Sequence, residues 1–277
     1  MQRESVDRYL EKITINLKLK GCSPRTIESY IFFLRPFLEL IDNPETISLE
    51  GMESFQASLV GRYSNKSRAL AVSSLRFFFK RIVDRPDLFV KLEVPKKERK
   101  LPSVLSVQEI QRLIDSTDFS KSKLMIKLLY SSGLRVSELV NLKLKEIELD
   151  ENIGWVRGGK GGKDRMFKIA NALTKEIQNY MDKNPYNQYL FSKEKPISTR
   201  NVQQIVKKSA EKAGINKKVT PHTLRHSFAT HLLDEGENLL VIQNLLGHES
   251  LDTTKIYTHI SQEQIKKVVS PLDNLKK

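Results

Sequence analysis

The stretch TPHTLRHSFATHLL (220–233) joins the start of a helix to two side chains suited to phosphate chemistry. Thr220 can cap a helix whose first position is Pro221, where the missing N–H of proline does no harm. His222 and Arg225 follow three residues apart, so they are predicted to share one face of this helix. An imidazole that accepts a proton would then lie near a guanidinium that holds phosphate oxygens.

A second arginine, Arg135, stands in SSGLRVSEL (131–139), just after a glycine break and near the start of a predicted helix. Helix N-termini attract anions, and a guanidinium can hold two phosphate oxygens at once. Glu138, three residues further on, can fix the arginine side chain. The alternative is an ordinary intrahelical ion pair between these two residues.

Lys160 lies in the glycine-rich stretch VRGGKGGKDR (156–165). The pattern is not a nucleotide-binding phosphate loop, because Arg157 replaces its first glycine and Asp164 replaces its Ser or Thr. A flexible hairpin tip with lysines suits insertion into a DNA groove, where Lys160 could donate a proton to a departing 5′-oxygen. The other reading is a solvated turn, and Lys163 is a second candidate for the same role.

His248 and Tyr257 are nine residues apart, a spacing that would place them on opposite faces of one helix. They can meet only if a helix begins between them, and Gly247 with Ser250 provides the break and the cap. A tyrosine needs cationic neighbours to ionise readily near neutral pH. The arginines, lysine and histidines above would supply them.

A metal site is the alternative reading of the histidines, because His226 lies one helical turn after His222. No third ligand follows at a suitable spacing, and a single cysteine, Cys22, excludes a cysteine-based zinc cluster and an internal disulfide framework. We therefore expect no metal and no cofactor, and we interpret His226 and His231 as structural residues.

The chain is predicted to be mainly α (α+β), with three regions. Residues 1–93 read as an N-terminal helical domain, 94–104 as a basic linker between prolines, and 105–277 as a mostly helical domain with a small three-stranded antiparallel sheet. Helices are expected at 3–19, 24–41, 48–60, 65–83, 107 onward, 121–131, up to 142, 171–182, 199–213, 221–235, 238–246 and 251–259, and strands at 146–150, 152–158 and 164–170. Phe77, Phe78 and Phe79 are interpreted as packing residues.

The chain has 277 residues and a net charge of +14, which favours a polyanionic partner such as nucleic acid over a merely solvated basic surface. No apolar run is long enough for a membrane span, and the charged start lacks the core of a secretory signal. A reducing cytoplasm fits the cysteine usage. The linker could lie along a DNA backbone or remain solvated; its basic residues are Lys96, Lys97, Arg99 and Lys100.

Together these motifs resemble the signature of the tyrosine recombinase (phage integrase) family, and their layout is most similar to its Xer branch. The resemblance is carried by SSGLRVSEL (131–139), GGKGGKDR (158–165), TPHTLRHSFATHLL (220–233) and IQNLLGHESLDTTKIYTHI (242–260). It is strong for about 105–260 and weak for 1–95.

The resemblance implies a DNA recombinase that cuts and rejoins strands without metal or ATP. Tyr257 would be the nucleophile that forms a 3′-phosphotyrosyl bond, and Glu138 a supporting acid. The other implied catalytic residues are Arg135 and Arg225 as phosphate clamps, Lys160 as general acid, His222 as proton acceptor and His248 as a second histidine on the phosphate.

The resemblance also implies that the two domains close around a duplex recombination site, and that four copies act on two duplexes through a four-way junction. Ser261 and Gln264 predict a capped tail helix with an apolar stripe of Ile265, Val268, Val269 and Leu272. This tail would dock into a neighbouring copy or back onto its own domain. A paralogue or a regulator is a further possible partner.

Resolution of chromosome or plasmid dimers is the expected task, which would link the protein to chromosome segregation, cell division and the nucleoid. Alternatives are DNA integration of a mobile element, relaxation by a type IB topoisomerase-like enzyme, and a DNA-binding protein that does not cut.

Overall fold

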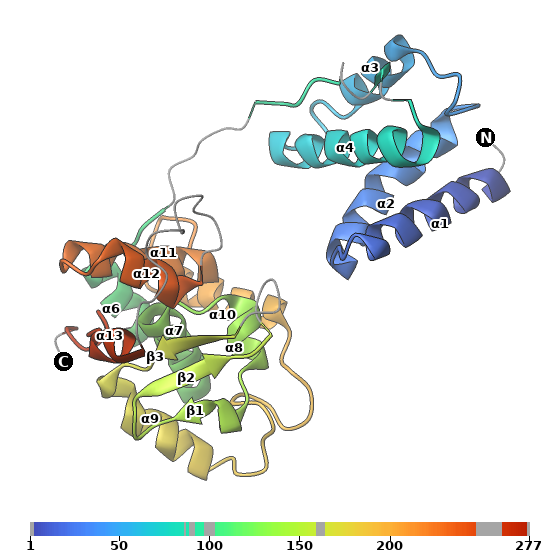
Figure 1. Ribbon diagram of the computed structural model, residues 1–277. Coiled ribbons are helices and arrows are strands. Elements are labelled where there is room, and N and C mark those ends of the chain that lie inside the picture. Colours follow the sequence, from blue (N-terminus) through green and yellow to red (C-terminus); the bar gives the residue numbers. More distant parts are fainter. Residues whose placement is uncertain are drawn as a thin grey trace. The chain divides into compact units, whose positions relative to one another are not determined.

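The computed structural model describes residues 3–85, 87–88, 92–96, 103–158, 164–247 and 262–275. The chain forms two compact units, Met1–Lys100 and Leu101–Lys277, each with a hydrophobic core of its own (Figure 1).

The N-terminal unit is built of helices, as predicted. Its described elements are α1 (Arg3–Leu19), α2 (Pro24–Leu40), α3 (Leu49–Ser58), α4 (Asn65–Phe78) and the π-helical turn η1 (Phe79–Val83). Serine side chains accept the first free backbone N–H groups at three of the four α-helix starts, so local sequence sets where these helices begin. These caps are Ser23, Ser48 and Ser64.

The core of this unit follows the periodicity of the sequence. Four apolar side chains of α1 at three- and four-residue spacing are buried: Val6, Leu10, Ile13 and Leu17. Phe78 and Phe79 are fully buried and meet edge to face, which confirms their packing role, while Phe77 is half-buried against Tyr30. The predicted fourth helix is wrong in one respect, because it widens into the π turn after Phe78. A left-handed residue, Asp84 with φ 57°, then ends it.

The C-terminal unit is mainly helical and carries one small sheet, which confirms the predicted class. Strands β1 (Ile147–Glu148), β2 (Ile153–Val156) and β3 (Arg165–Lys168) pair antiparallel in the order β1-β2-β3 (Figure 1). The other described elements are α6 (Val107–Asp115), α7 (Ser120–Ser132), α8 (Val136–Asn141), the 3-10 turn η2 (Leu144–Glu146), α9 (Asn171–Asp182), α10 (Thr199–Lys212), α11 (Pro221–Asp234), α12 (Leu239–Leu246) and α13 (Gln262–Lys267). The helix expected at 251–259 lies outside the described residues.

The centre of this unit is the packing of α7 against α11. Within it the Tyr130 hydroxyl lies 2.9 Å from Nδ1 of His231, and both side chains are buried. Burial raises the pKa of Tyr130, so this phenol stays neutral. The structural role predicted for His231 is confirmed, whereas His226 is exposed and does not belong to the core.

The C-terminal tail packs on its own unit. Ile265, Val268 and Leu272 join the buried core, and the Ser270 hydroxyl donates to the Ser131 carbonyl at 2.8 Å. Val269 is 53% exposed, so the predicted four-residue stripe is wrong at this position. The physical reason is that α13 ends at Lys267, and the residues after it no longer follow a helical period. The predicted cap at residues 261 and 264 lies outside the described side chains.

The turn between α7 and α8 depends on Gly133. Its φ is +58°, and a Cβ there would lie 2.6 Å from Cδ1 of Phe228 and 2.7 Å from Cδ2 of Leu246. We expect Gly133→Ala to lower the free energy of unfolding of this unit by about 1–3 kcal/mol more than Gly214→Ala does. Gly214 is the matched control, because its φ is +65° but nothing lies within 4 Å of its Cβ position. Urea unfolding measures both, and equal losses would rule out the packing effect.

Candidate active site

Glu138 lies at the centre of the candidate site. It stands in the first turn of α8, where its Oε2 accepts the backbone N–H of Arg135 at 2.8 Å and caps the helix. Its Oε1 accepts from Nη1 of the Arg135 side chain at 2.7 Å. The carboxylate is 7% exposed. The pair predicted from the spacing of three is thus present, and it is buried on the carboxylate side.

Two more arginines reach the same carboxylate from distant parts of the chain. Arg165, the first residue of β3, places Nη2 2.6 Å from Oε2 of Glu138. Arg225, in the middle of α11, places Nη1 4.0 Å from that oxygen. Three guanidiniums thus surround one carboxylate, and the cluster keeps an excess of positive charge. We call Arg135, Arg165, Arg225 and Glu138 the arginine cluster.

The C-terminal end of α12 completes the arginine cluster. Its last carbonyls have no partners within the helix and form the negative end of its dipole. Each accepts a hydrogen bond from a different guanidinium: Leu245 from Arg165, Leu246 from Arg225 and Gly247 from Arg135. Because the arginines are held on the protein side in this way, their positions are set without any bound anion.

Burial and mutual repulsion shape the charges of the arginine cluster. Burial, followed by the neighbouring Arg135 and Arg165, lowers the pKa of Arg225 to about 9. Burial acts to raise the pKa of Glu138, but Arg165 and the hydrogen bonds from Arg135 outweigh it, so the pKa is lowered and the group stays ionised. The arrangement therefore favours an added anion, which would stabilise the charged form of Arg225.

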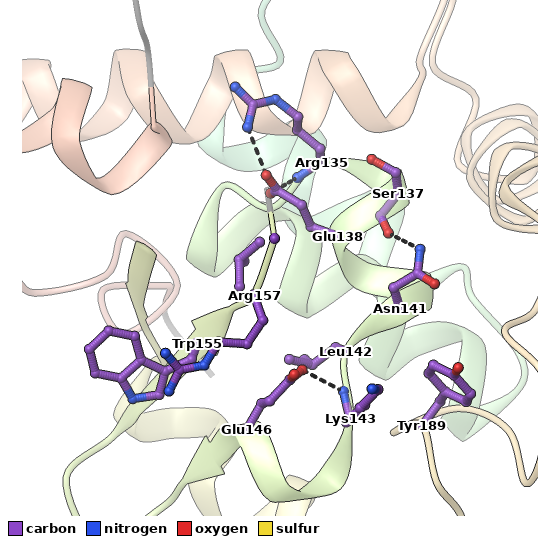
Figure 2. A pocket seen from close by; sticks show the side chains of 12 residues that line it. Arg135, Ser137, Glu138, Asn141, Leu142, Lys143, Glu146, Trp155, Arg157 and Tyr189 are labelled. Carbon is purple, nitrogen blue, oxygen red and sulfur yellow. Dashed lines mark hydrogen bonds and ion pairs between the residues drawn. The ribbon is translucent and has the colours of Figure 1, made fainter. Parts of the chain in front are cut away.

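A cavity of about 550 Å³ opens beside Arg135 and Glu138 (Figure 2). The guanidinium of Arg157 lies over the ring of Trp155, 4.6 Å from its centroid, and pairs with Asp164 at 2.7 Å. The rest of the lining mixes polar or charged side chains with two apolar ones, Leu142 and Val156; the polar or charged ones are Ser137, Asn141, Lys143, Glu146 and Tyr189.

Comparison with known proteins identifies the family. Residues 103–264 match the family described as phage integrase, and residues 9–87 match the phage integrase N-terminal SAM-like domain. Tyrosine recombinase XerA of Thermococcus kodakarensis is 40% identical over 94% of each chain. The chain is a Xer-type tyrosine recombinase. It is therefore a site-specific recombinase enzyme.

A further relative supports this assignment, and a solved structure supports the fold. Tyrosine recombinase XerD of Staphylococcus aureus is 34% identical to this chain, and the match covers 95% of this chain and 96% of XerD. The crystal structure of a lambda integrase tetramer bound to a Holliday junction is similar with a TM-score of 0.74, covering 92% of this chain and 80% of the other. Its identity of 18% makes that likeness one of fold alone.

The structure brings together some of the site residues predicted for the recombinase. Arg135, Glu138 and Arg225 meet in the arginine cluster. His222 is exposed in the first turn of α11, where it lines a second cavity, of about 570 Å³, together with Val136. Lys160, Lys163, His248 and Tyr257 lie outside the described residues. Of the described residues near these gaps, Arg165 belongs to the arginine cluster, and the Gly247 carbonyl accepts a hydrogen bond from Arg135.

The predicted linker residues of the recombinase are only partly described. Lys96 has an exposed side chain, and its backbone carbonyl accepts from Asn65 at 3.3 Å. Lys97, Arg99 and Lys100 lie outside the described residues. Within the described ranges no three His, Cys, Asp or Glu side chains gather as a metal site would require, and no helix there has the length and apolarity for a bilayer crossing.

Arg165 is the residue of the arginine cluster that sequence reasoning missed. The motif GGKGGKDR contains Arg165, but within this motif only the lysines of the turn were considered as functional residues. The available signal was weak: an arginine at the start of a predicted strand needs a carboxylate partner if it is buried. Nothing in the sequence identifies that partner as Glu138, which lies 27 positions earlier.

We expect sulfate to stabilise the C-terminal unit by binding at the arginine cluster. At a pH of about 7.5 it should raise the midpoint of thermal unfolding by about 2–4 °C over chloride at equal ionic strength. Folding lowers the pKa of Arg225, so its charge destabilises the empty site, and a bound anion offsets that effect.

Differential scanning calorimetry of three variants provides the controls. Arg135→Ala and Arg225→Ala should lose the sulfate shift, while Arg112→Ala, an exposed arginine of the same unit, should keep it. A full shift in Arg225→Ala would show that sulfate binds elsewhere.

Proposed function

We propose that the arginine cluster binds the DNA phosphate at which the recombinase cuts. The observation that carries the proposal is the convergence of three guanidiniums on one carboxylate, with a net positive charge and fixed positions. Arg135 and Arg225 would contact the non-bridging oxygens. They would stabilise the charge that develops on the five-coordinate phosphorus, in the place where other enzymes use a metal ion.

The proposed cleavage step is a transesterification. The Tyr257 hydroxyl oxygen bonds to phosphorus, the bond from phosphorus to the 5′-oxygen breaks, and a 3′-phosphotyrosyl link results. His222 accepts the phenolic proton, Lys160 gives a proton to the departing 5′-oxygen, and His248 donates a hydrogen bond to the phosphate. A 5′-hydroxyl from the partner strand reverses the step. Because the bond energy is retained, the reaction needs no ATP.

We assign DNA contacts to both units. Residues 1–93 would bind the core of the recombination site, and residues 105–277 would form the catalytic domain. The linker 94–104 would follow the DNA backbone through its basic residues, and Lys163 would enter a groove with the hairpin. The net charge of +14 supports this division, because neutralised phosphates supply much of the affinity for DNA.

We propose that four copies act on two duplexes through a four-way junction, with the C-terminal tail as one contact between copies. The fold likeness to the lambda integrase tetramer bound to a Holliday junction supports this assembly. A paralogue or a regulator could take part. The proposed task is the resolution of chromosome or plasmid dimers in the nucleoid before cell division. The match to XerA over 94% of both chains supports that choice over integration of a mobile element.

Tyr257→Phe should bind DNA with unchanged affinity and yield no covalent adduct, because the nucleophilic oxygen is gone. Denaturing electrophoresis with labelled DNA measures the adduct, and gel shift measures binding. Tyr186→Phe is the matched control, since Tyr186 is 85% exposed in the same unit, and it should form adduct normally. An adduct formed by Tyr257→Phe would remove this residue from its proposed role.

Arg135→Ala and Arg225→Ala should each slow adduct formation by about 100- to 1000-fold, while DNA affinity falls much less. The reason is that the cluster is proposed to stabilise the transition state more than the bound ground state. Single-turnover cleavage with DNA in excess over its Kd separates the two effects. Equal losses of affinity and rate would indicate plain phosphate binding.

Sequencing of the DNA ends trapped on the wild-type protein tests the biological task. Incubated with fragmented genomic DNA, the recombinase should attach at one short site that occurs once per replicon, as dimer resolution requires. Ends clustered at the borders of mobile elements would favour integration instead.

A further inference from the structure

We infer that Arg165 is a positioning residue of the cleavage step, which holds Glu138 so that Arg225 remains available to the DNA phosphate. The inference rests on the proposed function of the arginine cluster. It concerns a residue that is 11% exposed and makes its contacts with the protein. Its role would be exerted through Glu138 and the end of α12.

The contacts of Arg165 tie three separate segments together. Its Nη2 donates to Oε2 of Glu138 at 2.6 Å, and its Nη1 donates to the carbonyl of Leu245 in the last turn of α12. Its backbone is paired with Val156 across the β2–β3 ladder. A planar fork suits two acceptors held at a set angle, a task that the single point charge of lysine performs less well.

Competition for Glu138 explains why the third arginine matters. Oε1 accepts from the Arg135 side chain, and Oε2 accepts from Arg165 and from the backbone N–H of Arg135. Arg225 therefore stays 4.0 Å away and donates to backbone carbonyls instead. Without Arg165, Oε2 would be open to Arg225, and a buried carboxylate pairs strongly with a nearby guanidinium. Arg225 would then turn toward Glu138, and its charge would be neutralised by the protein.

A close contact with Gly247 is a separate observation that the fold fixes the position of Arg165. Gly247 has φ +61°, and a Cβ there would lie 2.7 Å from Cδ of Arg165. The last turn of α12 thus closes directly over the arginine stem. Nε of Arg165 is buried and has no hydrogen-bond partner within the described residues, so the side chain is held by its two Nη groups and by this contact.

Single-turnover cleavage of a DNA duplex, with gel shift for affinity, tests the inference. The DNA is recovered from the genomic trapping experiment. We expect Arg165→Met to slow cleavage by about 10- to 100-fold, as is usual when a group that orients a reacting residue is lost. DNA affinity should change by less than about threefold, since Arg165 is not proposed to touch DNA. Arg165→Lys should recover part of the rate, and Arg112→Met, on the exposed face of α6, should cleave as the wild type does.

The double variant Arg165→Met/Glu138→Gln separates positioning from a general loss of structure. If Arg165 acts by occupying Glu138, removing the charge of Glu138 should release Arg225, and the double variant should cleave faster than Arg165→Met alone. A merely structural role predicts a further loss instead, and that result would overturn the inference.

Gly247→Ala keeps the test decisive if Arg165→Met does not fold. It leaves Arg165 in the sequence but displaces its stem, so the rate should fall while affinity is retained. Normal cleavage by Gly247→Ala or by Arg165→Met would overturn the inference. No cleavage by the wild-type protein would count against the proposed function itself, so the two failures can be told apart.

Discussion

The site depends on one buried carboxylate, Glu138, shared among guanidiniums from three parts of the chain. Without it, the arginines would repel one another at short range in a poorly solvated place, and the cost would be several kcal/mol. A second carboxylate would cancel the excess charge and remove the attraction for an anion. One acid for three bases therefore lets the cluster fold while it keeps an excess of positive charge.

Backbone geometry turns this charge balance into fixed positions. Gly133 and Gly247, both in the left-handed region, end α7 and α12 at the points where the guanidiniums find carbonyl acceptors. The backbone carbonyls at these helix ends thus accept hydrogen bonds from the arginines. An enzyme that must stabilise charge for a brief moment gains most from dipoles and cations that need not reorganise. Within the described residues, each guanidinium of the cluster donates hydrogen bonds to at least two acceptors, which are backbone carbonyls or the Glu138 carboxylate.

Local rules were enough to predict much of this from the sequence. Helix α1 and the pair Arg135–Glu138 follow from spacing within a few residues. The role of Arg165 could not be predicted in this way, because its partners lie 27 and 80 positions away and are fixed by how β3 packs against α12. The exposure of Val269 was missed for a similar reason, since a helical stripe was extended past the residue where the helix ends.

The C-terminal tail packs against the elements that position the arginine cluster. Helix α13 contacts both β3 and α12, the two elements that bring Arg165 and the helix-end carbonyls to the cluster. The apolar side chains of the tail, Ile265, Val268 and Leu272, therefore support the backbone from which Arg165 extends. If copies exchange tails during assembly, the tail of the neighbouring copy must bury the same apolar side chains against β3 and α12. Otherwise these two elements would lose packing, and the arginine cluster would lose its alignment. Assembly and phosphate binding would then be coupled through the core, with no direct contact between the tail and the DNA.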